Sequence, residues 1–463
     1  MIRFFSDFIS LIYILIVLSK YRILSDLGSI YLNFPSQIFI RVISFLFYPF
    51  SSLYSCNQSF DQRLINCLKE LGPVYIKLGQ ILSTRPDLIG IEIASSLKLL
   101  QDNLPSFPTQ EAKKIIKESL KKEIDEMFIT FSNTPVAAAS IAQVYKAYLT
   151  TGEVVAVKVL RPGIYSKYIK NIKLLYFFVR FLLKFLPKIK RLKLIEVVDV
   201  LKNTMTCELN MKLEAASYSE MLENFKQDYY VYIPKVYWEF TSEKVLTTEW
   251  VSGISIYEHQ LIADQGISLK DISEKIVLMF FNQAYRDGFF HADLHPGNIV
   301  VLFDGRICLM DFGIMGRLSE VDRIAVAEIL YGFLKKDYKN VARVHKCAGY
   351  IPKDSDLDLF SQYCRSVAEP IIGVPLKNVS LGKLLTQLFQ ITENFGMETQ
   401  PQLLLLQKTM VLVEGISKSL NPEIDMWSLT EPWMKKWAAK NISLEAKVLR
   451  SCTNLLKQLI NKL

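Results

Sequence analysis

The feature that most constrains this chain is a pair of short polar motifs on either side of a hairpin. The first motif, HADLHPGN, runs from His291 to Asn298, and the second, DFG, begins at Asp311. Between them, two apolar runs flank Asp304-Gly305, a dipeptide typical of two-residue hairpin turns. Such a hairpin brings Asn298 and Asp311 to the same end of the strand pair. An amide and a carboxylate side by side suit Mg²⁺, which prefers hard oxygen ligands.

The spacing within the first motif is that of a kinase catalytic loop. Protein kinases carry H-R-D-x-x-x-x-N followed by D-F-G, and here Asp293 precedes Asn298 by five positions, as in that pattern. In this interpretation Asp293 lies near the attacking hydroxyl, and Asn298 and Asp311 hold magnesium beside the phosphates of ATP. Each residue alone is also compatible with a solvated turn, but the joint spacing favours a phosphoryl-transfer site.

A lysine upstream supports the same chemistry. GEVVAVKVL is rich in β-branched residues and predicts a strand that presents Lys158 to phosphates. The helical stretch that follows offers Glu208 and Glu214 as its charge partner. On one continuous helix these acids would lie about 9 Å apart along the axis and about 120° apart around it, so they cannot both pair with Lys158.

The flap over the phosphates departs from the protein-kinase pattern, because small residues other than glycine fill it. Alanine and serine reach positive φ less readily than glycine, so we expect a stiffer flap that holds the nucleotide differently. The candidate nucleotide-binding residues of the flap are Ala137, Ala138, Ala139 and Ser140.

The segment from Thr247 to Gly253 resembles the hinge between two kinase lobes. Backbone groups of Glu249 and Val251 would bind adenine there, whereas Trp250 is equally compatible with a core position. The chain has no A-P-E after the DFG motif, an element expected of kinases that dock protein substrates.

Periodicity along the chain predicts an α+β, bilobal protein-kinase-like fold. Helical spacing precedes a small sheet, and a mostly helical lobe follows it. The expected divisions are an apolar, membrane-associated segment 1–55, a helical extension 56–126, a smaller lobe 127–251 with a basic insert 161–195, and a helical lobe 252–463.

Composition narrows the class of protein. Half of the 463 residues are apolar, but 22% are charged, which is too many for a multi-span transporter. A net charge of +9 suits a phosphate-rich partner, which could be nucleic acid, a nucleotide or an anionic membrane. The seven cysteines include no CxxC pair, which indicates a reducing compartment and disfavours a transition-metal site.

Together these motifs resemble the UbiB family of atypical kinase-like proteins, also called AarF or ADCK-like. The most specific mark is Lys77-Leu78-Gly79-Gln80, which matches the family's KxGQ motif, and RPDLI after it also fits. The resemblance implies that the helical extension covers the active-site cleft. It also implies that Glu208 engages Lys77 and Gln80 as a regulatory contact, leaving Glu214 for Lys158.

Two departures from the family pattern are visible. The family's ExD motif reads Glu208-Leu209-Asn210 here, so an amide replaces the second acid. Ala142 replaces a glycine that the family usually has near the flap, which predicts further stiffening.

Three stretches indicate contact with a membrane. Two apolar runs, Phe8–Ser19 and Phe39–Phe50, are too short or interrupted to cross a bilayer easily, so we interpret them as interfacial or packed helices. Residues 161–195 carry ten basic side chains interleaved with LLYFFVRFLLKFLP and no acid. This pattern predicts binding to anionic lipids, although Leu174–Leu186 could instead pack as core.

The expected function is that of a UbiB-like ATPase, or atypical kinase, that uses ATP and Mg²⁺ and supports ubiquinone biosynthesis. The expected location is the cytoplasmic face of the inner membrane, and the expected partners are quinone precursors or other proteins of that pathway rather than nucleic acid. A hydroxylase is not expected, because the chain has no GxGxxG opening a βαβ unit and no oxygenase metal triad.

Two rival functions remain open. Small-molecule phosphotransferases of the aminoglycoside or choline kinase type also use HxDLHPGN-type loops, but a helix across the cleft would obstruct their substrates. A non-catalytic, lipid-binding nucleotide switch is the other rival. The presence of Lys158, Asp293, Asn298 and Asp311 gives no support to inactivity.

Overall fold

The protein folds into two compact units. The first contains Met1–Ala215 and Val236–Trp250, and the second contains Ala216–Lys235 and Val251–Leu463. Residues 216–235, which the sequence analysis placed in the smaller lobe, therefore pack with the second unit. The computed structural model describes residues 2–23, 58–83, 89–97, 100, 105–185, 194–372 and 400–441, with five single residues between 384 and 395.

Several stretches singled out from the sequence lie outside these described residues. They are the apolar run 39–50, Arg85 to Leu88 of RPDLI, and residues 186–193 of the basic insert.

The helical extension of the first unit starts with α1 (Ile2–Lys20), which packs on α5 (Phe60–Leu71). Val17 and Tyr21 form an apolar cluster with Cys67 of α5. The C-terminal part of the first apolar run is thus a packed helix. None of the helices in the described ranges is both long enough and apolar enough to cross a bilayer.

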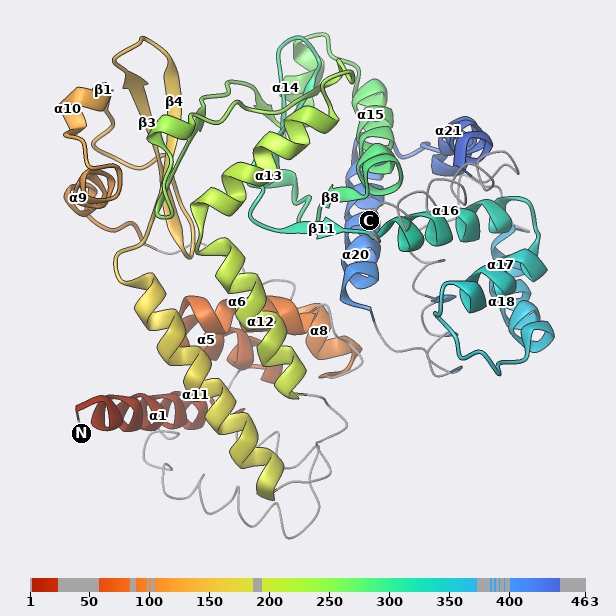
Figure 1. The fold of residues 1–463 in the computed structure, drawn as a ribbon, viewed down its shortest axis with the longest axis horizontal. Helices are drawn as coiled ribbons and strands as arrows, with labels where there is room; N and C mark the ends of the chain where they lie inside the picture. Colours follow the sequence, from red (N-terminus) through yellow and green to blue (C-terminus); the bar gives the residue numbers. More distant parts are fainter. Residues whose placement is uncertain are drawn as a thin grey trace, which may run out of the picture. The chain divides into compact units, whose positions relative to one another are not determined.

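The helix that carries the KxGQ motif, α6 (Pro73–Ser83), packs against α5 and α8 (Ile91–Leu97) (Figure 1). Its glycine lies at the point of closest approach. A Cβ atom on Gly79 would lie 2.4 Å from Leu100 Cδ1 and 2.8 Å from Leu68 Cδ1, so a larger residue would push these neighbours away.

A five-stranded antiparallel sheet follows the extension, with strand order β1-β3-β4-β6 and β2 paired to β3. Helix α9 (Thr109–Leu120) lies against β4 and β6 and shares their core, in which Ile116 and Val157 are fully buried (Figure 1). A single turn, α10 (Ile124–Met127), leads into the sheet. The strands are β1 (Phe128–Phe131), β2 (Ala137–Ala138), β3 (Ala142–Leu149), β4 (Val154–Leu160) and β6 (Val245–Glu249).

The segment just before β6 is not a regular strand. PKVYWEF forms only an isolated bridge, Val236 to Thr248, and then a 3₁₀ turn, η2 (Trp238–Phe240). The Thr247 hydroxyl donates a hydrogen bond to the Phe240 carbonyl at 2.7 Å, so a side chain takes the place of a ladder partner.

The basic insert forms α11 (Ile164–Phe185), which packs against α12 (Leu194–Glu208) and also contacts α1 (Figure 1). The Tyr168 hydroxyl donates to the Lys202 carbonyl at 2.7 Å, which ties the two helices together. One stripe of α11 is therefore core, as the alternative interpretation predicts. The exposed residues of α11 include Tyr165, Lys167, Lys173, Phe177 and Arg180.

The second unit has a four-stranded sheet of order β5-β10-β9-β7 and a two-stranded sheet, β11-β8. Strands β9 and β10 form the predicted hairpin, with Gly305 at φ +78° and its N–H bonded to the Leu302 carbonyl at 2.9 Å. The hairpin prediction is confirmed. The strands are β5 (Val231–Tyr232), β7 (Ile254–Ser255), β8 (Phe289–His291), β9 (Ile299–Val301), β10 (Ile307–Leu309) and β11 (Met315–Arg317).

Helices make up most of the second unit, and α15 and α20 lie side by side in its core (Figure 1). Mixed helix and small sheets give the α+β class that the sequence predicts. The helical segments are α13 (Met211–Asn224), shared with the first unit, α14 (His259–Asp264), α15 (Leu269–Phe281), η3 (Asn282–Asp287), η4 (Pro296–Asn298), α16 (Glu320–Leu334), α17 (Tyr338–Cys347), α18 (Leu357–Ile372), α20 (Pro401–Leu420) and α21 (Met426–Asn441).

Candidate active site

Lys158 lies on β4, a central strand of the first unit's sheet, and forms an ion pair with Glu214 of α13. Its ammonium nitrogen is 2.8 Å from Glu214 Oε1 and 3.0 Å from Oε2. The lysine side chain is 15% exposed and the glutamate side chain 3%. The two carboxylate oxygens therefore fix a lysine that keeps some access to solvent, as a phosphate-binding group requires.

The helix that was expected to carry both candidate acids is in fact two helices. Helix α12 ends at Glu208 and α13 begins at Met211, so the predicted separation along one axis is wrong. The break occurs at Asn210, whose side-chain oxygen accepts a hydrogen bond from the Lys212 N–H at 3.1 Å. Asparagine is a favoured residue at helix starts. The amide that replaces the family's acid thus serves as a cap.

The break leaves Glu208 on α12, where it pairs with Lys77 of α6. Their charged atoms are 2.6 Å apart, and the two side chains are 11% and 6% exposed. This is the pairing that the KxGQ resemblance implies. Gln80 Nε2 donates to the Leu100 carbonyl at 3.4 Å, and the expected contact between Gln80 and Glu208 stays a prediction.

The alanine-rich flap begins as β2, in which Ala138 pairs with Gln143 of β3. None of its four residues has positive φ, as expected for a segment without glycine. The Arg161 guanidinium donates two hydrogen bonds to the Ala139 carbonyl, at 3.0 Å from Nε and 2.8 Å from Nη2, and a third to the Pro105 carbonyl at 2.9 Å.

The membrane prediction, which counted Arg161 among ten basic groups, is therefore wrong for this residue. Its guanidinium braces the flap, so it is not one of the basic groups available to lipid. In the sequence it could not be told apart from the lysines that follow it.

The predicted hinge includes one crossing point between the two units, Trp250 to Val251. Glu249 is the last residue of β6. Trp250 is half-buried, and the Lys146 ammonium lies 4.8 Å from its ring centroid. The tryptophan therefore makes a cation–π contact at the edge of the first unit rather than filling a core.

The HADLHPGN loop of the second unit is held by its own histidine and asparagine. The Asp293 N–H donates to His291 Nδ1 at 3.1 Å, and Asn298 Nδ2 donates to the Asp293 carbonyl at 3.0 Å. His291 is fully buried, and burial lowers its pKa below the usual value. Its Nδ1 accepts, so its Nε2 carries the proton and donates to the Met310 carbonyl at 3.1 Å.

The β9–β10 register places Asn298 and Asp311 at the same end of the hairpin. Leu309 pairs with Ile299, and the Met310 N–H donates to the Asn298 carbonyl at 2.9 Å. The backbone at Asp311 has φ +59°, a conformation uncommon outside glycine and one that clusters at functional sites.

Tyr218 of α13 supports this strained residue, a role that no motif predicts. Its hydroxyl accepts the Asp311 N–H at 2.9 Å, and its ring packs edge-on against Phe312 with centroids 4.3 Å apart. From the sequence alone, a helical tyrosine whose hydroxyl accepts a distant N–H cannot be distinguished from one that only fills the core.

The residues present fit a magnesium ion. Asn298 uses its amide nitrogen within the loop, which orients its oxygen away from the Asp293 carbonyl. Within the described residues, no three His, Cys, Asp or Glu side chains gather as a metal site. Phosphate oxygens and water would therefore complete the coordination, as is usual for Mg²⁺.

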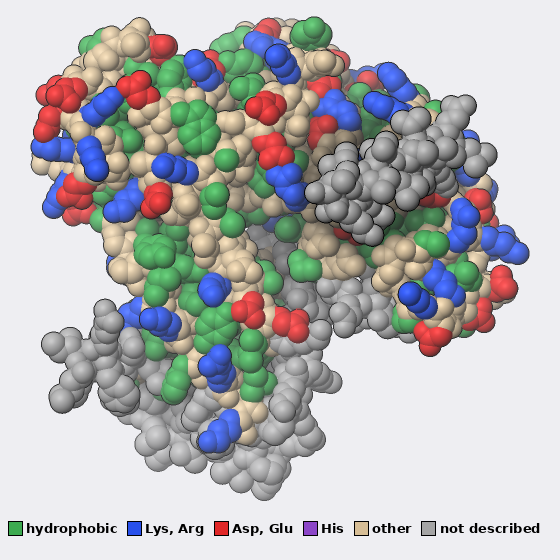
Figure 2. Space-filling view, in the orientation of Figure 1, with side chains coloured by type: hydrophobic (Ala, Val, Ile, Leu, Met, Phe, Trp, Pro, Cys, Tyr) green, Lys and Arg blue, Asp and Glu red, His purple; other side chains and the backbone are tan. Residues whose placement is uncertain are grey.

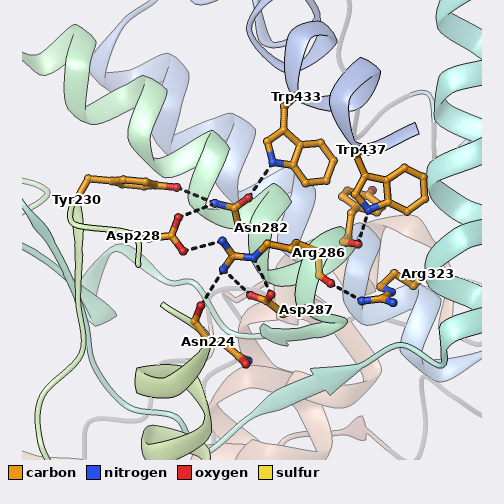
Figure 3. A network of polar contacts seen from close by, with 10 residues as sticks. Asn224, Asp228, Tyr230, Asn282, Arg286, Asp287, Arg323, Trp433 and Trp437 are labelled. Atoms are coloured by element: carbon orange, nitrogen blue, oxygen red, sulfur yellow. Dashed lines mark hydrogen bonds and ion pairs between the residues drawn. The ribbon is translucent and has the colours of Figure 1, made fainter. Parts of the chain in front are cut away.

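A polar network anchors the segment that leads into the catalytic loop (Figure 3). This segment, η3, is a π-helix, a form often found near functional sites. Arg286 donates to Asp228 and Asp287, each at 2.7 Å, and Asn282 bonds both Asp228 and the Trp433 indole.

The same segment reaches the catalytic loop directly. Gln283 Oε1 accepts the His291 N–H at 2.9 Å. The network thus fixes the loop's first residue to the core of the second unit, a role that no motif in the sequence indicated.

Comparisons with known proteins identify the family of this chain. Residues 99–345 match the ABC1 atypical kinase-like domain, and residues 364–425 match the UbiB helical domain. A probable protein kinase UbiB from Marinobacter nauticus is 40% identical over 430 residues, covering 92% of this chain and 78% of the relative. Another from Azotobacter vinelandii is 42% identical over 388 residues, covering 83% and 72%.

A solved structure shows that the fold is shared more widely. The complex of Rv3197 with erythromycin, from Mycobacterium tuberculosis, matches with a TM-score of 0.52 at 23% identity, covering 80% of this chain and 94% of that one. With two domain matches and curated relatives along most of its length, this chain belongs to the UbiB family of atypical kinase-like proteins.

Proposed function

We propose that this protein binds Mg²⁺–ATP and hydrolyses it slowly. The Lys158–Glu214 ion pair carries this proposal, because kinase folds require the strand lysine and the helix glutamate to be paired for catalysis.

The remaining residues have separate roles in this proposal. Lys158 binds phosphate oxygens, and Asn298 and Asp311 hold the magnesium ion, which supplies positive charge beside the transferred phosphoryl group. Asp293 orients the attacking oxygen. The braced alanine flap, with Ala137, Ala138, Ala139 and Ser140, faces the phosphates, and the backbone of Glu249 and Val251 binds adenine.

Hydrolysis is favoured over transfer to proteins. The Lys77–Glu208 pair fixes the KxGQ helix to α12, and the chain has no A-P-E element for docking a protein substrate. We expect negligible labelling of generic peptides by the wild-type chain. The family assignment also favours this reading over an aminoglycoside- or choline-kinase-like enzyme.

We further propose that the protein supports ubiquinone biosynthesis from the cytoplasmic face of the inner membrane, attached through α11. Hydrophobic and basic side chains lie together over this part of the surface (Figure 2). Phe177 and Tyr165 are 57% and 61% exposed beside Lys167, Lys173 and Arg180. Aromatic and basic groups on one helical face are typical of interfacial helices.

Nucleotide binding tests the first proposal. Mg²⁺–ATP at 100 times Kd should stabilise the wild-type fold by about 2.7 kcal/mol, visible as a raised Tm. Asp311→Asn should lose the magnesium-dependent part of that shift and the hydrolysis of ATP. If Asp311→Asn responds to magnesium as the wild type does, the metal assignment is wrong.

Flotation with liposomes tests the membrane proposal. Each basic group near an anionic surface contributes about 1 kcal/mol, and salt screens this attraction. Lys167→Gln, Lys173→Gln and Lys184→Gln together should weaken flotation with anionic vesicles. Three exposed lysines elsewhere, changed together as Lys114→Gln, Lys121→Gln and Lys226→Gln, serve as the control. Equal flotation with neutral vesicles would contradict an electrostatic mechanism.

Deletion of the gene tests the pathway. Cells without the protein should contain less quinone and accumulate its precursors. Unchanged quinone levels would remove the link to this pathway and leave the ATPase proposal standing.

A further inference from the structure

The catalytic loop receives a cation from a distant part of the chain. Between His291 and Asn298 the loop contains no lysine or arginine. Lys408 of α20 provides one, with its ammonium nitrogen 2.9 Å from Asp293 Oδ1 across 115 positions of sequence.

The position of Lys408 is set by a well-anchored helix. Leu406 and Met410, on either side of Lys408, are buried, and α20 packs along α15 and contacts β11, the strand paired with β8 (Figure 1). Ser273 of α15 donates its hydroxyl to the Ser417 carbonyl at 2.8 Å, and the Ser417 hydroxyl donates back to the Ser273 carbonyl at 3.4 Å.

Two hydrogen bonds within the loop act on the backbone of Asp293. Its N–H bonds to His291 and its carbonyl to Asn298. The ion pair with Lys408 acts on the carboxylate itself. Both side chains are over a third exposed, at 36% and 38%, and ion pairs this exposed add little to stability.

We propose that Lys408 is a positioning residue that holds the Asp293 carboxylate in the orientation needed for catalysis. The inference rests on the proposed ATP hydrolysis. In that reaction a water oxygen bonds to the γ-phosphorus while the bond to the β,γ-bridging oxygen breaks. ADP leaves with that electron pair, and the released proton passes to solvent by way of Asp293. Lys408 fixes the carboxylate that orients the water.

A pair of lysines on the same helix gives a matched test. Lys418 is also 36% exposed and also pairs with an acid, Glu414, at 2.7 Å, but within α20. Lys408→Met should lower kcat by about 10- to 100-fold and leave both the KM for ATP and the Mg²⁺–ATP shift in Tm unchanged. Lys408→Arg, which keeps the charge, should recover most of kcat, and Lys418→Met should keep the wild-type kcat.

A double-mutant cycle separates positioning from a general structural effect. If Lys408 acts through Asp293, Lys408→Met should cost nothing further in an Asp293→Asn background. An equal loss in both backgrounds, a change confined to KM, or a wild-type kcat for Lys408→Met would each overturn the inference while the proposed function stands. A wild-type protein that hydrolyses no ATP would overturn the proposed function and this inference with it.

Discussion

The two units bury four ionisable groups in different ways, three of them in the candidate site and the fourth, His345, on α17. In the first unit, Lys77 is buried and Lys158 partly buried as charges, each against a glutamate within 2.8 Å. In the second, His291 and His345 are buried as neutral rings, and burial lowers the pKa of both. All four histidines of the chain belong to the second unit.

This difference between buried ion pairs and buried neutral rings predicts which change, mutation or acid, lowers the stability of each unit. A buried ion pair contributes little net stability, but loss of one partner leaves an uncompensated charge in a poorly solvated place. A buried neutral histidine lowers the free energy of unfolding only when the pH falls far enough to favour its protonated form. Mutation should therefore damage the first unit most, and low pH should act on the second through its histidines.

The largest expected effect is the loss of the acid that pairs with Lys77. Glu208→Gln removes the carboxylate that lies 2.6 Å from the buried lysine ammonium, so the free energy of unfolding should fall by about 3–5 kcal/mol. Replacing both partners, as Lys77→Met with Glu208→Leu, should recover most of that loss. Urea unfolding measures all three proteins.

An exposed pair in the same unit provides the control. Lys122 and Glu239 are also 2.6 Å apart, but their side chains are 42% and 69% exposed. Glu239→Gln should therefore cost less than about 1 kcal/mol, because water solvates the remaining lysine. Similar losses for Glu208→Gln and Glu239→Gln would show that burial of the first pair has no energetic consequence.

Acid should destabilise the second unit through His345. Its pKa is lowered to about 4 by burial, against an ordinary value of 6.5. The unfolded chain then binds more protons between these values, so the stability is full above pH 6.5 and declines as pH falls toward 4. The difference corresponds to about 3 kcal/mol at most.

Comparison with His345→Gln isolates this contribution. The variant should be less stable at pH 7, because packing against Phe360 is lost, yet its stability should fall less steeply between pH 6.5 and 4. Hydrogen exchange resolved by peptide would show whether the acid effect lies in the second unit. Parallel pH curves for the two proteins would contradict the buried-neutral assignment.

Lys77 and Lys158 should differ in catalysis, although each is paired with a buried glutamate. Lys158→Met removes the phosphate-binding charge, and kcat/KM for ATP should fall at least about 100-fold, or about 2.7 kcal/mol. Lys77→Met should lower it less than 10-fold and change the preference among nucleotides. Steady-state hydrolysis of ATP and GTP measures both, and equal losses would remove the distinction between catalytic and regulatory pairs.

What the sequence could predict depends on whether a contact is local. The hairpin between Asn298 and Asp311 follows from Asp304-Gly305 and two flanking runs, all within a short stretch. The helix break at Asn210 is equally local, but the sequence does not predict it, because one asparagine can either cap a helix or lie within it. Its effect was large, since it sends Glu208 and Glu214 to different lysines.

Contacts between distant segments could not be predicted from spacing. Arg161 looked like a member of a basic stretch until the fold placed the Ala139 carbonyl beside it. Lys408 is separated from Asp293 by 115 positions, and nothing around it in the sequence marks it. These side chains acquire a role only through the packing of whole helices.

The smallest expected effect concerns Tyr218, another residue of this kind. Its hydroxyl is the acceptor for the N–H of Asp311, whose positive φ is unfavourable without support. Tyr218→Phe keeps the ring contact with Phe312 but removes that acceptor, which should cost about 1 kcal/mol or slightly more.

If the strain then relaxes, Asp311 moves, and the affinity for Mg²⁺ in the presence of ATP should fall about 5- to 10-fold. Activity at saturating magnesium should recover, which distinguishes a displaced ligand from a lost one, as in Asp311→Asn. Magnesium titrations of ATP hydrolysis measure this, and an unchanged magnesium requirement for Tyr218→Phe would mean that the tyrosine only fills space.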